Sequence, residues 1–210
     1  MTRHTYAGQT AIVGIGATEF SKASGRSELQ LALEACVAAC EDAGVDPSEV
    51  RGLSTFTMET NPETEIMRGL GIAELTHFSR IHFGGGAPCA TVQYAAMAVA
   101  SGVADYVLCY RAFNERSGRR FGAGVQDNPA GATAEMAQFA WTSPFGLLTP
   151  ASWVAMFASR MMHEYGVTSE DFGRIAVADR RHAATNPAAF FYEQPITLAD
   201  HQNSRWIVEP

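Results

Sequence analysis

The sequence predicts an α/β fold in which helices pack on the faces of a layered sheet. Along the first 110 residues, short apolar runs alternate with helical patterns in the order strand, helix, strand, helix, strand, helix, strand. A nearly uncharged, Ala-rich segment at 87–101 follows three glycines and predicts a buried central helix. The chain has 210 residues, 47% hydrophobic and 18% charged, which is enough for a substantial core.

The first two elements are a strand and an amphipathic helix. Residues 10–16 (TAIVGIG) form a continuous apolar run that ends in glycine, which is typical of a strand buried on both faces. Gly14 and Gly16 resemble half of a dinucleotide-binding fingerprint, but no helix opens directly after them, so the sequence does not indicate such a site. Residues 27–44 predict the clearest helix, because Ser27 can cap its start and Gly44 can end it.

A second strand at 52–57 and a short helix at about 62–70 lead to the central segment. This segment has a short strand before His82, a glycine turn, the helix from about Ala87 to Ser101, and a further strand at 106–110. A helix start that follows three glycines offers free backbone N–H groups and the positive end of the helix dipole to a ligand. The turn is therefore a candidate binding site.

The remainder of the chain is less regular. Residues 111–148 show no hydrophobic periodicity and are rich in basic residues and glycine. A loop of this length in a compact domain usually has a function or forms an interface. Helices are predicted at 151–165 and from a cap at Ser169 to about 184, and the tail at 196–210 shows no closing element. We find no repeat or linker, so the sequence predicts one unit over 1–210 with 111–148 as an irregular loop insertion.

Charge and cysteine content argue against several classes. A net charge of −7 gives no global attraction for nucleic acid or an anionic membrane, and no window reaches membrane-spanning length. The N-terminus lacks an apolar run of signal-peptide length, so we expect a cytoplasmic protein. Cys36, Cys40, Cys89 and Cys109 fall in apolar patterns without metal-ligand spacing, which predicts four reduced, buried thiols and no metal site.

Three stretches match a known family in order and spacing: 11–20 with the helix at 31–44, then 84–108, and 165–187 trailing into 207–210. Together they resemble the thiolase superfamily, specifically its sterol-carrier and lipid-transfer-type branch. The resemblance implies a thiolase-like layered α/β fold with a mixed sheet and a buried central helix. It covers only the N-terminal half of a typical member, and the acid–base motifs belong to the second half. We therefore expect a fragment, or a chain that a partner completes.

The resemblance leaves the nucleophile position open. In condensing thiolases a reactive Cys begins the central helix, where the dipole and free N–H groups lower its pKa. Aligning the helix ends places that position at about Gly85, and Cys89 comes one turn later. Cys89 is either a nucleophile or a packed thiol. Loss of the Cys fits the lipid-transfer-type branch, some of whose members resemble retro-aldolases that cleave β-hydroxyacyl-CoA side chains, including those of steroids.

Retro-aldol cleavage needs a base for the β-hydroxyl proton and donors for the thioester enolate, but no sulfur nucleophile. His82 is the ionisable group beside the glycines, although a His at a strand end is more often structural. Tyr94 and Tyr110 are weaker candidates. Residues that could bind an acyl-CoA belong to the glycine turn or to a basic loop whose arginines could meet a CoA phosphate: Gly84, Gly85, Gly86, Ala87, Arg119 and Arg120, with Arg111 and Arg116 nearby.

The first interpretation is an enzyme that performs retro-aldol cleavage of a β-hydroxyacyl-CoA once its second half or a partner is present. The alternatives are an acetyl-CoA acetyltransferase that uses Cys89 and a non-catalytic acyl-CoA-binding or scaffold subunit. We expect a CoA thioester as substrate and no bound cofactor. The resemblance further implies a homodimer through the strand at 106–110 and, in the aldolase branch, a small zinc-containing OB-fold partner.

Overall fold

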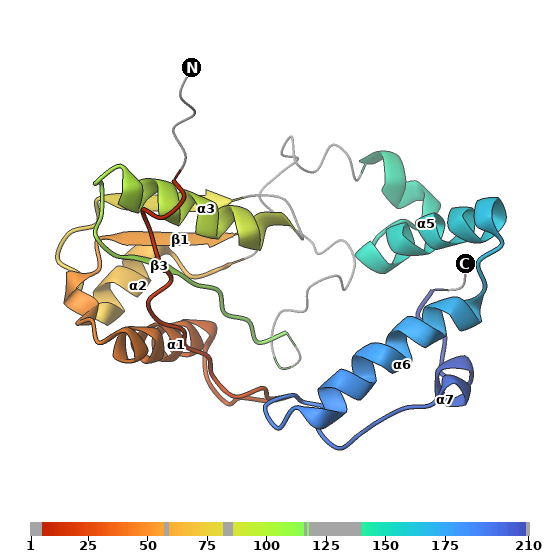
Figure 1. Cartoon of the computed structure of the whole chain (residues 1–210). Coiled ribbons are helices and arrows are strands. Elements are labelled where there is room, and N and C mark those ends of the chain that lie inside the picture. The colour runs from red at the N-terminus through yellow and green to blue at the C-terminus, as the bar shows by residue number, and fades with distance from the viewer. Residues whose placement is uncertain (1–5, 57–58, 82–85, 116, 118–139, 209–210) are drawn as a thin grey trace. The chain divides into compact units, whose positions relative to one another are not determined.

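The structure is a computed structural model that describes residues 6–56, 59–81, 86–115, 117 and 140–208. The chain divides into two compact units, Met1–Arg119 and Arg120–Pro210 (Figure 1). The boundary between them falls inside the irregular stretch at 111–148. Each unit is a body of its own.

The first unit is built on a three-stranded sheet with the order β2-β1-β3. Strand β1 (Gly52–Phe56) lies in the centre and pairs with β2 (His77–Ile81) and β3 (Val107–Cys109). These strands lie where the sequence predicts them. Both pairings are parallel, so the antiparallel strand that a mixed sheet requires is not found among the described residues.

Two helices cover one face of this sheet. Helix α1 (Glu28–Ala43) begins after Ser27, whose side chain accepts a hydrogen bond from the Gln30 N–H, and ends at Gly44 in the left-handed conformation. A short 3-10 helix, η1 (Pro47–Glu49), precedes β1, and α2 (Glu63–Leu70) follows it. These elements and the sheet enclose the core, whose buried members are Leu31, Ala32, Cys36, Cys40, Val50, Leu53, Ile66, Leu70, Ile72, Tyr110 and Ala112.

Helix α3 (Ala87–Ala100) lies on the opposite face from α1 and α2 (Figure 1). One side of it is buried through Ala87, Thr91, Ala95 and Ala98, which recur every three or four residues. Its other side is exposed, including Tyr94 at 47%. The prediction of a helix buried on most sides is therefore wrong for this unit, because α3 packs on the strands with one face.

Two further expectations need correction. Cys36 and Cys40 are buried as predicted, whereas Cys89 and Cys109 have exposed side chains. Residues 10–16 form no strand, and the run instead lies against α1. The reason is its glycine spacing: a Cβ added at Gly16 would stand 2.2 Å from the carbonyl oxygen of Ala35, so only glycine permits this close approach to the helix.

The second unit is helical where the structure describes it. It contains a 3-10 helix, η3 (Ser143–Phe145), and the helices α5 (Pro150–Tyr165), α6 (Ser169–Thr185) and α7 (Leu198–Gln202). The cap of α6 is Thr168, one residue before the predicted Ser169. Helix α7 packs against α6 but has no counterpart in the sequence-based prediction.

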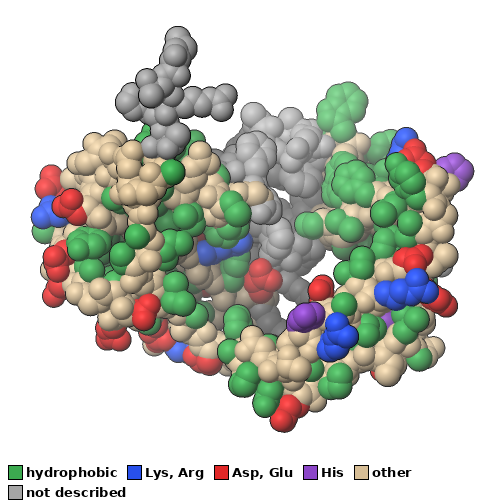
Figure 2. Space-filling model, in the orientation of Figure 1, with side chains coloured by type: hydrophobic (Ala, Val, Ile, Leu, Met, Phe, Trp, Pro, Cys, Tyr) green, Lys and Arg blue, Asp and Glu red, His purple; other side chains and the backbone are tan. Residues whose placement is uncertain are grey.

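Apolar side chains reach the surface of both units (Figure 2). In the second unit, Phe157 on α5 is 69% exposed, and α5 buries none of its residues. No helix among the described residues is long and apolar enough to cross a membrane.

Candidate functional site

The carboxyl ends of the three strands define one edge of the sheet. Strand β1 ends at Phe56, β2 at Ile81 and β3 at Cys109, and these ends lie together because the strands are parallel. Ligands of open α/β sheets bind at this edge. Several predicted site residues lie outside the described residues, so the structure does not place them: His82, Gly84, Gly85, Arg116, Arg119 and Arg120.

The start of α3 lies at the same edge. Gly86 is its N-cap, Ala87 is its first residue and Pro88 follows in the first turn, and no described side chain caps the N-terminal N–H groups. Ala87 is buried at 2% exposure. A Cβ added at Gly86 would meet nothing within 4 Å in the described part of the chain, so this part leaves open space in front of the residue. This arrangement is compatible with the predicted approach of a ligand to a helix N-terminus.

Cys89 lies in the first turn of α3 with an exposed side chain. The interpretation of Cys89 as a packed thiol is therefore wrong for this unit. An exposed thiol at the start of α3 is what the nucleophile alternative requires, and substitution of Cys89 tests that alternative.

The two tyrosine candidates differ in exposure. Tyr94 lies on the exposed side of α3, whereas Tyr110 follows β3 and is only 7% exposed. The Tyr110 hydroxyl has no hydrogen-bond partner among the described residues, and burial, followed by the charge of Glu59, raises its pKa well above its usual value. Tyr110 therefore belongs to the core of the unit.

Sequence reasoning missed a buried carboxylate at this edge. Glu59, which follows β1, is only 4% exposed. It accepts hydrogen bonds from the Asn61 N–H at 3.0 Å, from the Asn61 side-chain amide and from the Ala112 N–H at 2.7 Å. Arg80 donates to the Glu59 carbonyl oxygen. Glu59 thus ties the turn after β1 to the segment after β3, and its only signal in the sequence was its place just beyond a buried strand.

Arg111 precedes Ala112, whose N–H donates to Glu59. The Arg111 side chain packs on two aromatic rings. Its guanidinium carbon lies 4.1 Å from the ring centroid of Phe56 and 3.9 Å from that of Phe113. Its Nε is buried and has no hydrogen-bond partner among the described residues. Burial lowers the pKa of Arg111, and the charges of Glu115 and Glu59 oppose this shift. The side chain remains a cation at neutral pH.

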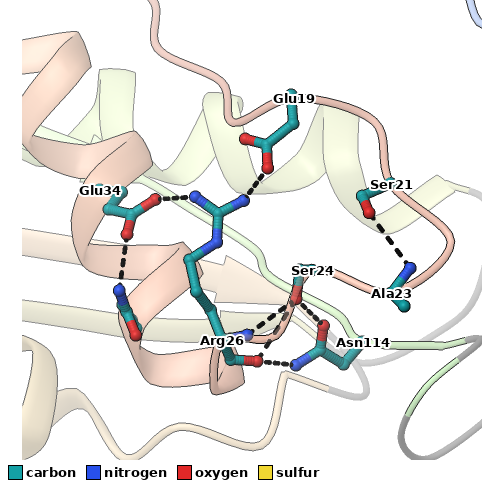
Figure 3. A network of polar contacts seen from close by, with 8 residues as sticks. Glu19, Ser21, Ala23, Ser24, Arg26, Glu34 and Asn114 are labelled. Atoms are coloured by element: carbon teal, nitrogen blue, oxygen red, sulfur yellow. Dashed lines mark hydrogen bonds and ion pairs between the residues drawn. The ribbon is translucent and has the colours of Figure 1, made fainter.

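Arg111 lines a pocket of about 400 Å³ within the first unit, between the segment 16–24 and residues 111–115 with Ser117. Leu31 and Ala35 of α1 contribute to its wall. Figure 3 shows the polar network beside it: Arg26 forms ion pairs with Glu19 and Glu34, and Asn114 donates to the Arg26 carbonyl oxygen. The hydrogen bond to Arg26 lowers the pKa of Glu19.

The polar network fixes the two sides of the pocket to each other. The Ser24 hydroxyl donates to the Asn114 side-chain oxygen at 2.8 Å, across 90 residues of sequence. The described residues contain no group of three or more His, Cys, Asp or Glu side chains that could hold a metal ion.

Comparison with known proteins identifies the architecture. No family model matches the chain. Over 97% of its length the chain is 66% identical to a steroid side-chain-cleaving aldolase of Thermomonospora curvata and 62% identical to a 17-hydroxy-3-oxo-4-pregnene-20-carboxyl-CoA lyase of Mycobacterium tuberculosis. The solved Ltp2-ChsH2(DUF35) aldolase is 66% identical and superposes with a TM-score of 0.85 over 95% of this chain and 50% of that one.

A more distant structure has the same fold. It is the monomeric SCP2-thiolase-like protein type 1 from Mycobacterium smegmatis, which is 21% identical and superposes with a TM-score of 0.56 over 84% of this chain and 35% of that one. The chain therefore has a thiolase-like fold. This thiolase-like chain spans about half the length of the curated relatives it matches, 52% of the aldolase and 53% of the lyase. The resemblance read from the three sequence stretches is confirmed.

Proposed function

We propose that this thiolase-like chain is part of an enzyme that cleaves a carbon–carbon bond of a β-hydroxyacyl-CoA by retro-aldol chemistry, with a steroid side chain as the substrate class. The observation that carries the proposal is its identity of 66% and 62% to an aldolase and a CoA lyase over nearly its whole length. Because the chain matches only half of each relative, the acid–base groups are expected from a second half or a partner.

The reaction requires two kinds of group. A base removes the β-hydroxyl proton, the bond between the α- and β-carbons breaks, and the β-carbon becomes a carbonyl. The electron pair passes to the thioester enolate, which is then protonated at the α-carbon. Hydrogen-bond donors at the enolate oxygen lower the barrier. The uncapped N–H groups at the start of α3 are our candidates for these donors, and His82 is a candidate base.

The open space at Gly86 supports this placement and allows a direct test. In Gly86→Ala the new methyl group meets no atom of the described residues within 4 Å, so folding should be unaffected. If the acyl-CoA approaches this point, the methyl group should raise KM or lower kcat by about tenfold or more, because small misplacements of a bound substrate are costly. Steady-state kinetics and thermal unfolding of the product of the complete coding frame would measure both. Unchanged kinetics would show that the substrate binds elsewhere.

Replacement of Cys89 separates the aldolase from the acyltransferase. We expect Cys89→Ala to retain cleavage within about threefold of the unsubstituted protein, because retro-aldol chemistry needs no sulfur nucleophile. Cys109→Ala, which removes the other exposed thiol, is the matched control. A loss of activity of several orders of magnitude in Cys89→Ala alone would favour the acetyltransferase.

The proposed assembly includes a homodimer and a small zinc-containing OB-fold partner. Strand β3 lies at an edge of the described sheet, so its outer backbone groups are available for pairing with a second copy. The solved relative is itself a complex of two named components, Ltp2 and ChsH2. Light scattering of the complete protein should give the mass of a dimer, and metal analysis of the co-purified complex should find zinc. A monomer that is fully active alone would contradict this assembly.

A further inference from the structure

Arg111, which lines the pocket, lies at a favoured place for a ligand. Strand β1 is the middle strand: β2, the next strand along the chain, lies on one side of β1, and β3 lies on the other side. The crevice beyond the carboxyl ends of β1 and β3 is therefore the switch point of the strand order, where open α/β sheets bind their ligands. Phe56 ends β1 and Arg111 closely follows β3, so their ring–guanidinium contact lies at this crevice.

Arg111 has an unmet hydrogen-bonding requirement there. Aromatic rings contact the guanidinium but accept no strong hydrogen bond, and its buried Nε has no acceptor among the described residues. A buried donor without an acceptor is costly, so such a group in a native protein calls for an explanation. A planar guanidinium satisfies its donors best with the paired oxygens of a phosphate or carboxylate.

The protein holds this cation in place. Glu59, itself buried, accepts the hydrogen bond of the Ala112 N–H at 2.7 Å and so fixes the backbone next to Arg111. On the other side, Asn114 is tied to Ser24 and to the Arg26 carbonyl oxygen. Because the backbone on both sides of Arg111 is fixed, the residue loses little conformational entropy when it binds an anion.

The charges that line the pocket are mixed. Lys22 adds a second basic residue to the lining, and the charge of Glu19 is offset in part by Arg26, which Glu19 shares with Glu34. Glu115 also lines the pocket and would repel an anion. The volume of about 400 Å³ is within the usual range for part of a cofactor-sized ligand.

From these contacts we infer that the pocket binds a phosphate group of coenzyme A, with Arg111 as its main cation. The inference rests on the proposed function, because it is the acyl-CoA substrate that supplies the phosphate. The ribose 3′-phosphate and the diphosphate bridge share this chemistry. Arg111 is thus the main contact of the CoA phosphate, a contact that the sequence predicts mainly for Arg119 and Arg120.

The test is a set of binding titrations on the product of the complete coding frame, using CoA, 3′-dephospho-CoA and 4′-phosphopantetheine. Arg111→Met should weaken CoA binding by about ten- to a hundredfold, as expected for the loss of hydrogen bonds to a charged group. Arg111→Lys should retain only part of the affinity for CoA, since lysine lacks the planar guanidinium that binds two phosphate oxygens at once. Glu115→Gln should tighten binding. Arg51→Met is the matched control, because Arg51 pairs with Glu74 at the amino-terminal edge of the sheet.

The comparison of CoA with 3′-dephospho-CoA distinguishes the two sources of phosphate. A preference for CoA over 3′-dephospho-CoA that disappears in Arg111→Met identifies the 3′-phosphate. Equal binding of these two compounds, weakened alike by Arg111→Met, identifies the diphosphate bridge. If the unsubstituted protein binds CoA and Arg111→Met binds it equally well, the assignment of Arg111 is wrong while the proposed function stands. If the unsubstituted protein binds no CoA, both fail.

Discussion

The buried carboxylate of Glu59 offers a sharp test of how the first unit is held together. Replacing Glu59 with alanine leaves the Ala112 N–H and the Asn61 N–H without their acceptor, and both lie inside the unit. A buried donor left without a partner costs about 1–3 kcal/mol. The Asn61 side-chain amide can turn away, so the two backbone groups dominate. We therefore expect Glu59→Ala to lower the free energy of unfolding by about 2–4 kcal/mol.

Glu59→Gln is the comparison that separates hydrogen bonding from packing. Glutamine keeps the shape and one acceptor oxygen, but its NH₂ group faces a donor, so the loss should be about 1–2 kcal/mol. Urea unfolding measures the stability, and hydrogen exchange at the Ala112 amide reports the local bond. Glu74→Ala removes an exposed partner of Arg51 and should change neither. If Glu59→Ala unfolds like the unsubstituted protein and leaves Ala112 protected, the assigned role of Glu59 is wrong.

The remaining predictions concern the core, a cap and two thiols. Ile66→Ala, at a site with 0% exposure, should cost about 2–5 kcal/mol in urea unfolding, and a loss below 1 kcal/mol would mean that the core is packed otherwise. Ser27→Ala should cost about 1 kcal/mol through the lost cap on α1, and no change would argue against that cap. Cys89 should react with iodoacetamide at pH 8 while Cys36 stays unlabelled, because burial raises the pKa of Cys36 from 9.0 to about 12; rapid labelling of Cys36 in the folded protein would contradict its burial. Since the folded state keeps the Cys36 thiol protonated, its contribution to stability is complete below pH 9 and is lost as the pH rises through about 12, so Cys36→Ala should flatten the alkaline fall in the unfolding free energy.

Elements fixed by local chemistry were predictable from the sequence. The ends of α1 follow from a serine that caps the first turn and a glycine that adopts the left-handed conformation at Gly44, and both can be read without knowing the fold. Helix α7 was missed although its signal is also local. Thr197 and Asp200 form a capping box, which is visible in the sequence as a threonine and an acidic residue three positions apart.

Features that depend on distant partners were not predictable. Glu59 reads as one more acidic residue after a strand until the fold brings Ala112, 53 residues away, onto its carboxylate. The apolar run at 10–16 has the composition of a strand, but Gly14 and Gly16 allow its backbone to lie directly on α1. Arg111 was one arginine of a basic group, and only the fold distinguishes it by packing it on Phe56 and Phe113.

The most direct test of the central claim is mass spectrometry of the complete protein, with its partner, incubated with a β-hydroxyacyl-CoA. The account predicts a ketone and a shortened acyl-CoA in equal amounts, with no acyl group on Cys89 at any time point. The same products should form with Cys89→Ala. Accumulation of an acyl group on Cys89, together with its transfer to free CoA and no ketone, would contradict retro-aldol cleavage and establish the acyltransferase instead.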